Sequence, residues 1–144
     1  MNKILIIGNE NVGKTTFLNN FYKVLLKMGA NELAKEQVGE NPNDFIAIIE
    51  FGSKTICINT AGDQVNYIND AVIQSEGEKC DILLSACRTD IKGKKTFPEE
   101  NWECLQAEKM DDILYITKQN GNQCNEIREE EILKDVTLIL SSNE

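Results

Sequence analysis

A glycine-rich turn between two apolar segments constrains this chain more than any other part of the sequence. Residues 8–15 read Gly-Asn-Glu-Asn-Val-Gly-Lys-Thr, which has the spacing G-x-x-x-x-G-K-[ST]. The short apolar run 3–7 before the turn is typical of a strand buried in a parallel sheet. After the turn, apolar residues recur at helical spacing over 14–28, and Gly29 is typical of a helix end. A strand, a glycine turn and a helix in this order predict an α/β fold.

The chemistry of this turn suits phosphate groups. Glycines let the backbone point successive N–H groups inward, and the following helix presents its positive amino end to the same anion. In this arrangement Lys14 would reach the β- and γ-phosphates, and the hydroxyl of Thr15 would ligate Mg²⁺. A glycine turn that binds nothing is the alternative. The residues expected to bind the nucleotide are Gly8, Asn9, Glu10, Asn11, Val12, Gly13, Lys14, Thr15 and Thr16.

The rest of the pattern alternates strands with helices. Two β-rich runs separated only by Gly52 and Ser53 predict a hairpin. The order predicts a single three-layer domain over 1–144, with a mostly parallel six-strand sheet and one antiparallel edge strand. After the first strand and helix, strands are expected at 45–51, 54–59, 81–86, 112–116 and 136–140, helices at about 66–76, 98–110 and 125–134, and a loop at 30–43.

Composition excludes several classes of function. The 24 acidic residues against 15 lysines and arginines give a net charge of −9, which argues against nucleic acid as the main partner. Histidine is absent, so no Ser-His or Cys-His nucleophile can form. The five cysteines include no C-x-x-C pair, and no apolar run is long enough for a signal peptide or a membrane span. We therefore expect a cytoplasmic protein with no membrane partner.

Four segments together resemble a known family. They are the glycine turn 8–15, the hairpin around Gly52, the turn Asn59-Thr60-Ala61-Gly62, which looks like D-x-x-G, and the segment Thr117-Lys118-Gln119-Asn120, which looks like [NT]-K-x-D. With them the chain resembles the P-loop NTPases, and among these the small-GTPase-like branch. The resemblance implies a P-loop NTPase domain that binds ATP or GTP with Mg²⁺, and it implies base recognition by Lys118 and Asn120.

The sequence departs from that family at particular positions. Asn59 stands where the family has an aspartate that supports Mg²⁺. Asp63 falls where the family has its water-orienting glutamine, so Asp63 joins Thr15 as a candidate metal residue and is also a candidate catalytic residue. Asn120 replaces the aspartate that accepts two guanine N–H bonds, and an amide offers only one acceptor. ATP is therefore slightly favoured over GTP.

Arg88 is a candidate that lies outside the resemblance. It follows the strand 81–86, and the carboxyl ends of parallel strands share one edge, so it is expected beside Lys14. Its guanidinium would stabilise charge on the γ-phosphate or hold an acceptor substrate; alternatively, it is a surface arginine paired with an acid.

These features favour Mg²⁺-dependent binding of a purine nucleoside triphosphate with slow hydrolysis, with Lys14, Asp63 and Arg88 as the catalytic residues. A small-molecule or nucleotide kinase that uses Arg88 and its loop for the acceptor is one alternative. A non-catalytic nucleotide-sensing or assembly module is another.

The end of the pattern also predicts an assembly. Only four polar residues follow the expected strand 136–140, which leaves no helix after the last strand to cover the sheet. The single helix 14–28 is too small to shield a six-strand face. We therefore expect a homo-oligomer, or a protein partner, on the face beside that helix.

Overall fold

The computed structural model describes residues 1–10, 12–91, 94, 96–98, 101–110, 113–120 and 123–128 of the chain. The helices within them are α1 (Lys14–Lys27) and α2 (Val65–Gly77). The strands are β1 (Asn2–Gly8), β2 (Asn31–Gln37), β3 (Phe45–Phe51), β4 (Lys54–Asn59), β5 (Ile82–Arg88), β6 (Trp102–Met110), β7 (Ile113–Asn120) and β8 (Gln123–Arg128).

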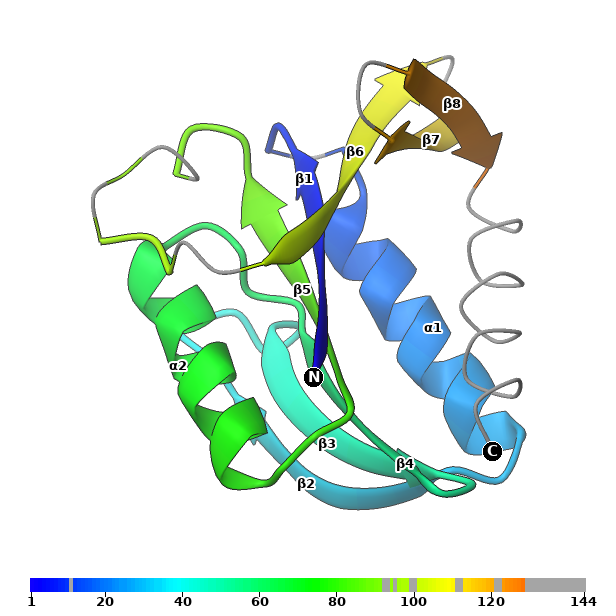
Figure 1. Ribbon diagram of the computed structural model, residues 1–144, viewed down its shortest axis with the longest axis vertical. Helices are drawn as coiled ribbons and strands as arrows, with labels where there is room; N and C mark the ends of the chain where they lie inside the picture. Colours follow the sequence, from blue (N-terminus) through cyan, green and yellow to red (C-terminus); the bar gives the residue numbers. More distant parts are fainter. Residues whose placement is uncertain are drawn as a thin grey trace.

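These strands form one sheet in the order β2-β3-β4-β5-β1-β6-β7-β8 (Figure 1). Parallel pairing joins the central strands β4, β5, β1 and β6. Antiparallel pairs flank this centre on both sides. The α/β class is confirmed, and so is the hairpin around Gly52, formed by β3 and β4. The described sheet has eight strands instead of the six expected, and its antiparallel part is not confined to one edge.

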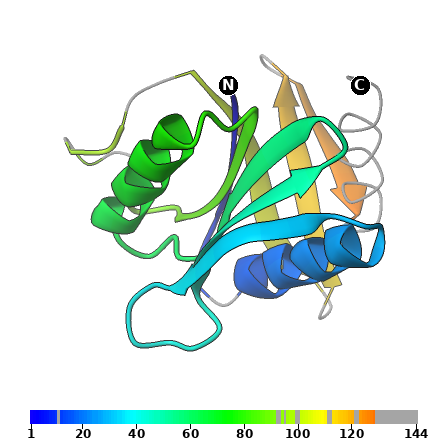
Figure 2. The ribbon, with the colours of Figure 1, turned by 90° about the horizontal axis from the view of Figure 1, so that it is seen from below.

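The helices cover opposite faces of the sheet, which gives the expected three layers (Figure 2). Phe17 and Phe21 of α1 pack on the face that includes Ile6 of β1, whereas Ala71 of α2 packs against Leu83 of β5 on the other face. Burying each large apolar side chain contributes about 1.5–3 kcal/mol relative to exposure. Because β1 is covered on both faces, its whole apolar run is buried, as expected of a central parallel strand.

The region 98–110, expected to be a helix, contains strand β6, so that prediction is wrong. Leu105 and Ala107 face α1, whereas Trp102 and Cys104 pack on the opposite side, a spacing of two within each pair. The segment contains Glu, Leu, Ala, Lys and Met, and these residue types favour a helix locally. The backbone of β1, however, has a second edge to satisfy, and pairing with β6 satisfies it. This long-range pairing overrides the local preference.

Other expected elements also differ from the structure. The expected loop 30–43 contains the edge strand β2, whose residues are all exposed and which pairs only with β3 among the described strands. The expected helix at 125–134 is strand β8 as far as Arg128. The rest of that helix and the expected strand 136–140 lie outside the described residues, as does the expected lack of a C-terminal helix.

The predicted partner on the face beside α1 stays a prediction. It depends on the segment after 128, which lies outside the described residues. In the part that is described, the large side chains of this face are buried, among them Phe45, Ile56 and Leu84. Within the described part of the chain, neither helix has the length and the apolar character that crossing a membrane requires.

Candidate functional site

The glycine loop, residues 8–15, lies at the carboxyl edge of the parallel strands. Gly8 ends β1, and Gly13 has φ 108°, a conformation that favours glycine, immediately before α1. A Cβ on Gly8 would lie 2.6 Å from the carbonyl oxygen of Ala107 in β6. The first glycine is therefore required by close packing against the neighbouring strand, and the second by the turn into the helix. Val12 packs against the core beneath. Asn11 lies outside the described residues.

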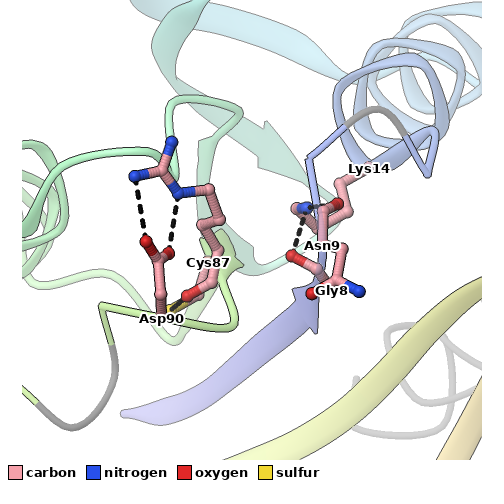
Figure 3. A network of polar contacts seen from close by, with 6 residues as sticks. Gly8, Asn9, Lys14, Cys87 and Asp90 are labelled. Atoms are coloured by element: carbon pink, nitrogen blue, oxygen red, sulfur yellow. Dashed lines mark hydrogen bonds and ion pairs between the residues drawn. The ribbon is translucent and has the colours of Figure 1, made fainter.

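Lys14 is folded back along the glycine loop (Figure 3). Its Nζ donates hydrogen bonds of 2.6 Å to the carbonyl of Gly8 and 2.7 Å to that of Asn9. The residue is only 9% exposed. Burial lowers the pKa of Lys14, because desolvation disfavours the charged ammonium. An anion at this place would favour the charged form again.

A polar cavity of about 520 Å³ opens above the loop. Of the residues that the structure describes, three acids and two bases contribute to its wall, and several of them come from segments far apart in the chain. The lining residues are Glu10, Gly13, Lys14, Thr15, Thr16, Asn41, Asn43, Asp44, Thr60, Gly62, Asp63, Ala86 and Arg88. The structure thus brings Lys14, Thr15, Asp63 and Arg88 to one cavity.

The turn after β4 is organised by Asn59. This residue is fully buried, and its Nδ2 donates to the carbonyl of Ala61 and to Ser85 Oγ, both at 3.0 Å, while its Oδ1 accepts from the Ala61 N–H. All of these hydrogen bonds of the Asn59 amide go to protein groups, Ala61 in the turn and Ser85 in β5. The next residue, Thr60, lies on the cavity wall, and its carbonyl accepts a hydrogen bond of 3.4 Å from Thr15 Oγ1.

Arg88 lies beside the glycine loop, since it pairs with Gly8 in the register of β1 and β5. Its guanidinium is bidentate to Asp90, with distances of 2.7 and 3.1 Å (Figure 3). These hydrogen bonds raise the pKa of Arg88 and lower that of Asp90. Arg88 also lines a second, more open hollow with Asn9 and Thr89. The guanidinium can therefore contact a ligand in the main cavity only if it leaves Asp90 or divides its donors between Asp90 and that ligand.

Sequence reasoning missed Asp44. This residue precedes β3, and a small turn places it: Asn41 Oδ1 accepts from the Asn43 N–H at 2.9 Å, and the Asn41 carbonyl accepts from the Asp44 N–H at 3.0 Å. Asp44 Oδ1 accepts from Thr60 Oγ1 at 3.2 Å. Burial raises the pKa of Asp44 most, and the neighbouring hydroxyls of Thr60 and Thr15 oppose this shift. In the sequence, the position of Asp44 at the end of a loop and directly before a strand is the signal that could have marked it as a candidate site residue.

Lys118 and Asn120 lie away from the glycine loop. Lys118 of β7 pairs with Leu105 of β6, whereas Gly8 pairs with Ala107. Because β7 runs antiparallel to β6, Asn120 lies two residues further from the loop edge, about 13 Å along the strand from the level of Gly8. The structure therefore does not bring this expected base-recognition segment to the cavity.

Comparison with known proteins found no match to this chain among protein-family models, curated proteins or solved structures. The fold and site together define an α/β protein with a polar, partly acidic cavity where a glycine loop meets the start of a helix.

Proposed function

We propose that this chain binds a nucleoside triphosphate as its Mg²⁺ complex, with the phosphates on the glycine loop, and hydrolyses it slowly. The position of Lys14 carries this proposal. Its buried ammonium is held by the carbonyls of Gly8 and Asn9 at the amino end of α1. In α/β folds with parallel strands, ligands bind at this edge of the sheet, and a helix amino end attracts anions.

The loop offers the groups that a triphosphate needs. α1 begins without a hydrogen bond from a capping side chain, so its first N–H groups remain for an anion. On binding, Lys14 exchanges two carbonyl contacts for phosphate oxygens, which are stronger, charge-assisted partners. The hydroxyl of Thr15 lines the same cavity and donates to the Thr60 carbonyl at 3.4 Å, and it would be the residue to hold the metal ion.

The charges of the cavity favour a metal complex over a bare nucleotide. Among the described residues, Glu10, Asp44 and Asp63 line it against Lys14 and Arg88. Three carboxylates and a triphosphate repel each other unless cations compensate. Mg²⁺ bound together with the triphosphate would supply that compensation. Binding should therefore depend strongly on Mg²⁺.

Hydrolysis would use the rim of the cavity. Arg88 is adjacent to Gly8 across the β1–β5 pair, within the wall that also holds Asp63. Rotation of the guanidinium from Asp90 toward the γ-phosphate would stabilise transition-state charge, and Asp63 would orient the attacking water. The need to leave Asp90 is one reason to expect slow turnover.

A phosphotransferase is the second candidate, because a neighbouring cavity favours it. This cavity of about 540 Å³ shares Asp63 with the first, and its lining includes Val65 beside polar residues such as Gln64, Asn69 and Thr96. A polar acceptor bound there would adjoin the γ-phosphate. The two candidates separate in one assay: a hydrolase releases inorganic phosphate without an added acceptor, and a kinase requires the acceptor.

The test is a thermal-shift panel of ATP, GTP, CTP, UTP and ADP, each with Mg²⁺ and with EDTA. Ligand at a hundred times its Kd stabilises the chain by about 2.7 kcal/mol, which is several degrees in Tm. We expect Lys14→Ala to abolish the shift and Lys23→Ala, an exposed change on the same helix, to preserve it. Equal shifts in the two variants, or no shift of the parent chain with any nucleotide, would contradict the proposal.

A further inference from the structure

The Mg²⁺ ion of the proposed complex has no acidic ligand at the position where the D-x-x-G pattern places an aspartate. Asn59 occupies the aspartate position of the D-x-x-G-like turn, and its amide is fully buried and bonded to Ala61 and Ser85. An amide with no charge, turned into the sheet, cannot neutralise Mg²⁺. If the cavity holds Mg²⁺ with a nucleotide, the carboxylate must come from elsewhere.

Asp44 is linked through Thr60 to the hydroxyl of Thr15 in the glycine loop. Thr15, Thr60 and Asp44 come from three separate segments and form one chain of contacts. Thr15 Oγ1 donates to the Thr60 carbonyl at 3.4 Å, and Thr60 Oγ1 donates to Asp44 Oδ1 at 3.2 Å. The Thr15 hydroxyl also lies close enough to the Asp44 carboxyl to favour its ionised form. All three residues line the cavity.

The cations of the cavity are engaged elsewhere. Lys14 is bonded to backbone carbonyls, and Arg88 is paired with Asp90. Within the part of the chain that the structure describes, no ion pair neutralises Asp44. Its half-buried carboxylate faces the cavity beside a second acid, Asp63, whose charge adds to the negative potential. A small hard cation with oxygen ligands fits this environment.

We propose that Asp44, together with the hydroxyl of Thr15, ligates the divalent cation that accompanies the nucleotide. This inference rests on the proposed function of the glycine loop. Mg²⁺ keeps several waters and is held by one or two carboxylates plus substrate phosphates. The described residues contain no group of three or more acidic, cysteine or histidine side chains that could hold a metal ion. The metal alone should therefore bind weakly, and the triphosphate should complete its coordination.

The experiment compares the affinity of a fluorescent ATP analogue (mant-ATP) in Mg²⁺ and in EDTA. The ratio of the two affinities is the Mg²⁺ enhancement. Asp44→Asn keeps an oxygen for the Thr60 hydroxyl and removes the charge, so we expect the enhancement to fall at least tenfold. The affinity in EDTA should stay equal or rise, because one repelling charge is gone. Asp70→Asn, an exposed change on α2, is the matched control and should keep the parental ratio.

A direct measurement of the metal accompanies the affinities. Electron paramagnetic resonance of Mn²⁺ should show weak binding by the parent chain alone, tight binding with ATPγS, and loss of the tight component in Asp44→Asn. If Asp44→Asn is unfolded at room temperature, Asp44→Glu replaces it in the experiment. This change displaces the carboxylate by one methylene, and we expect it to reduce the Mg²⁺ enhancement at least threefold.

The outcomes separate this inference from the function on which it rests. The role of Asp44 alone is overturned if a folded Asp44 variant shows the same Mg²⁺ enhancement as the parent chain. In that case the variant still binds mant-ATP, and Lys14→Ala still abolishes mant-ATP binding. If the parent chain binds mant-ATP in neither condition and no nucleotide of the thermal-shift panel raises its Tm, the proposed function fails, and the role of Asp44 fails with it.

Discussion

The backbone N–H of Arg88 donates a hydrogen bond of 2.7 Å to the carbonyl of Gly62. This contact joins the end of β5 to the turn that follows β4, so two walls of the cavity are tied together through the main chain. The approach is close because Gly62 has no side chain. A Cβ on it would lie 2.4 Å from the carbonyl carbon and 2.5 Å from the carbonyl oxygen of Ala86.

Gly62→Ala should therefore destabilise the fold. The atoms that a methyl group meets are backbone and cannot rotate away, so the turn or β5 must shift, at about 3 kcal/mol. Gly77→Ala is the matched control, since its Cβ meets nothing within 4 Å at the end of α2, and it should be neutral or stabilise by up to about 1 kcal/mol. Urea unfolding of both variants measures the difference. Equal stabilities would contradict the close approach.

Arg88→Ala should lower triphosphate turnover about a hundredfold while leaving the Kd of the Mg²⁺-nucleotide nearly unchanged. A group that acts on transition-state charge affects kcat and not ground-state binding. Single-turnover kinetics and mant-ATP titration measure the two quantities. Asp90→Asn, which releases the guanidinium from its partner, should retain or raise turnover. If Arg88→Ala keeps the turnover of the parent chain, Arg88 is only a surface residue paired with Asp90.

Asn59→Asp should destabilise the chain instead of restoring a metal ligand. The change removes both donors to Ala61 and Ser85 and places a charge at a fully buried position, which costs about 3 kcal/mol at pH 7.5. Burial raises the pKa of such a carboxyl above its unfolded value, so the deficit shrinks as pH falls toward 5. Urea unfolding at both pH values tests this, with the exposed Asn66→Asp as control. A gain in Mg²⁺ enhancement would contradict the placement of Asn59.

Tyr22→Phe should weaken the attachment of β2 to α1. The Tyr22 hydroxyl donates to Glu32 of β2, and a hydrogen bond to a charged group contributes about 1.5–3 kcal/mol. Burial, together with Glu32, raises the pKa of Tyr22 to about 12. The folded pKa lies above the unfolded value near 10, so this contribution is complete below pH 10 and is lost as pH rises through 12.

Between pH 10 and 12 the parent chain should therefore lose more stability than Tyr22→Phe does. A double-mutant cycle with Glu32→Gln at pH 8 isolates the pair. A coupling energy near zero would show that the hydroxyl and the carboxylate do not stabilise each other.

Much of the first half of this chain could be predicted because its signals are local. The loop geometry around Gly8 and Gly13, helix α1 and the β3–β4 hairpin each depend on neighbouring residues. The placement of Arg88 beside the loop followed from one general rule, that parallel strands share an edge for their carboxyl ends. Sequence reasoning failed for β6, whose composition favours a helix, because its strand state depends on the open edge of β1, about a hundred residues earlier in the chain.

By itself, the sequence determined that a strand, a glycine turn and an amphipathic helix come in that order, and that Lys14 and Thr15 begin the helix. These features need only steric and hydrogen-bonding preferences within a few residues. The tertiary structure alone decided that Asn59 is consumed in its turn, that Asp44 reaches the cavity, and that the strand with Asn120 runs away from it. Those outcomes depend on which strand edges pair and in which direction, and pairing energies between distant segments leave no local pattern in the sequence.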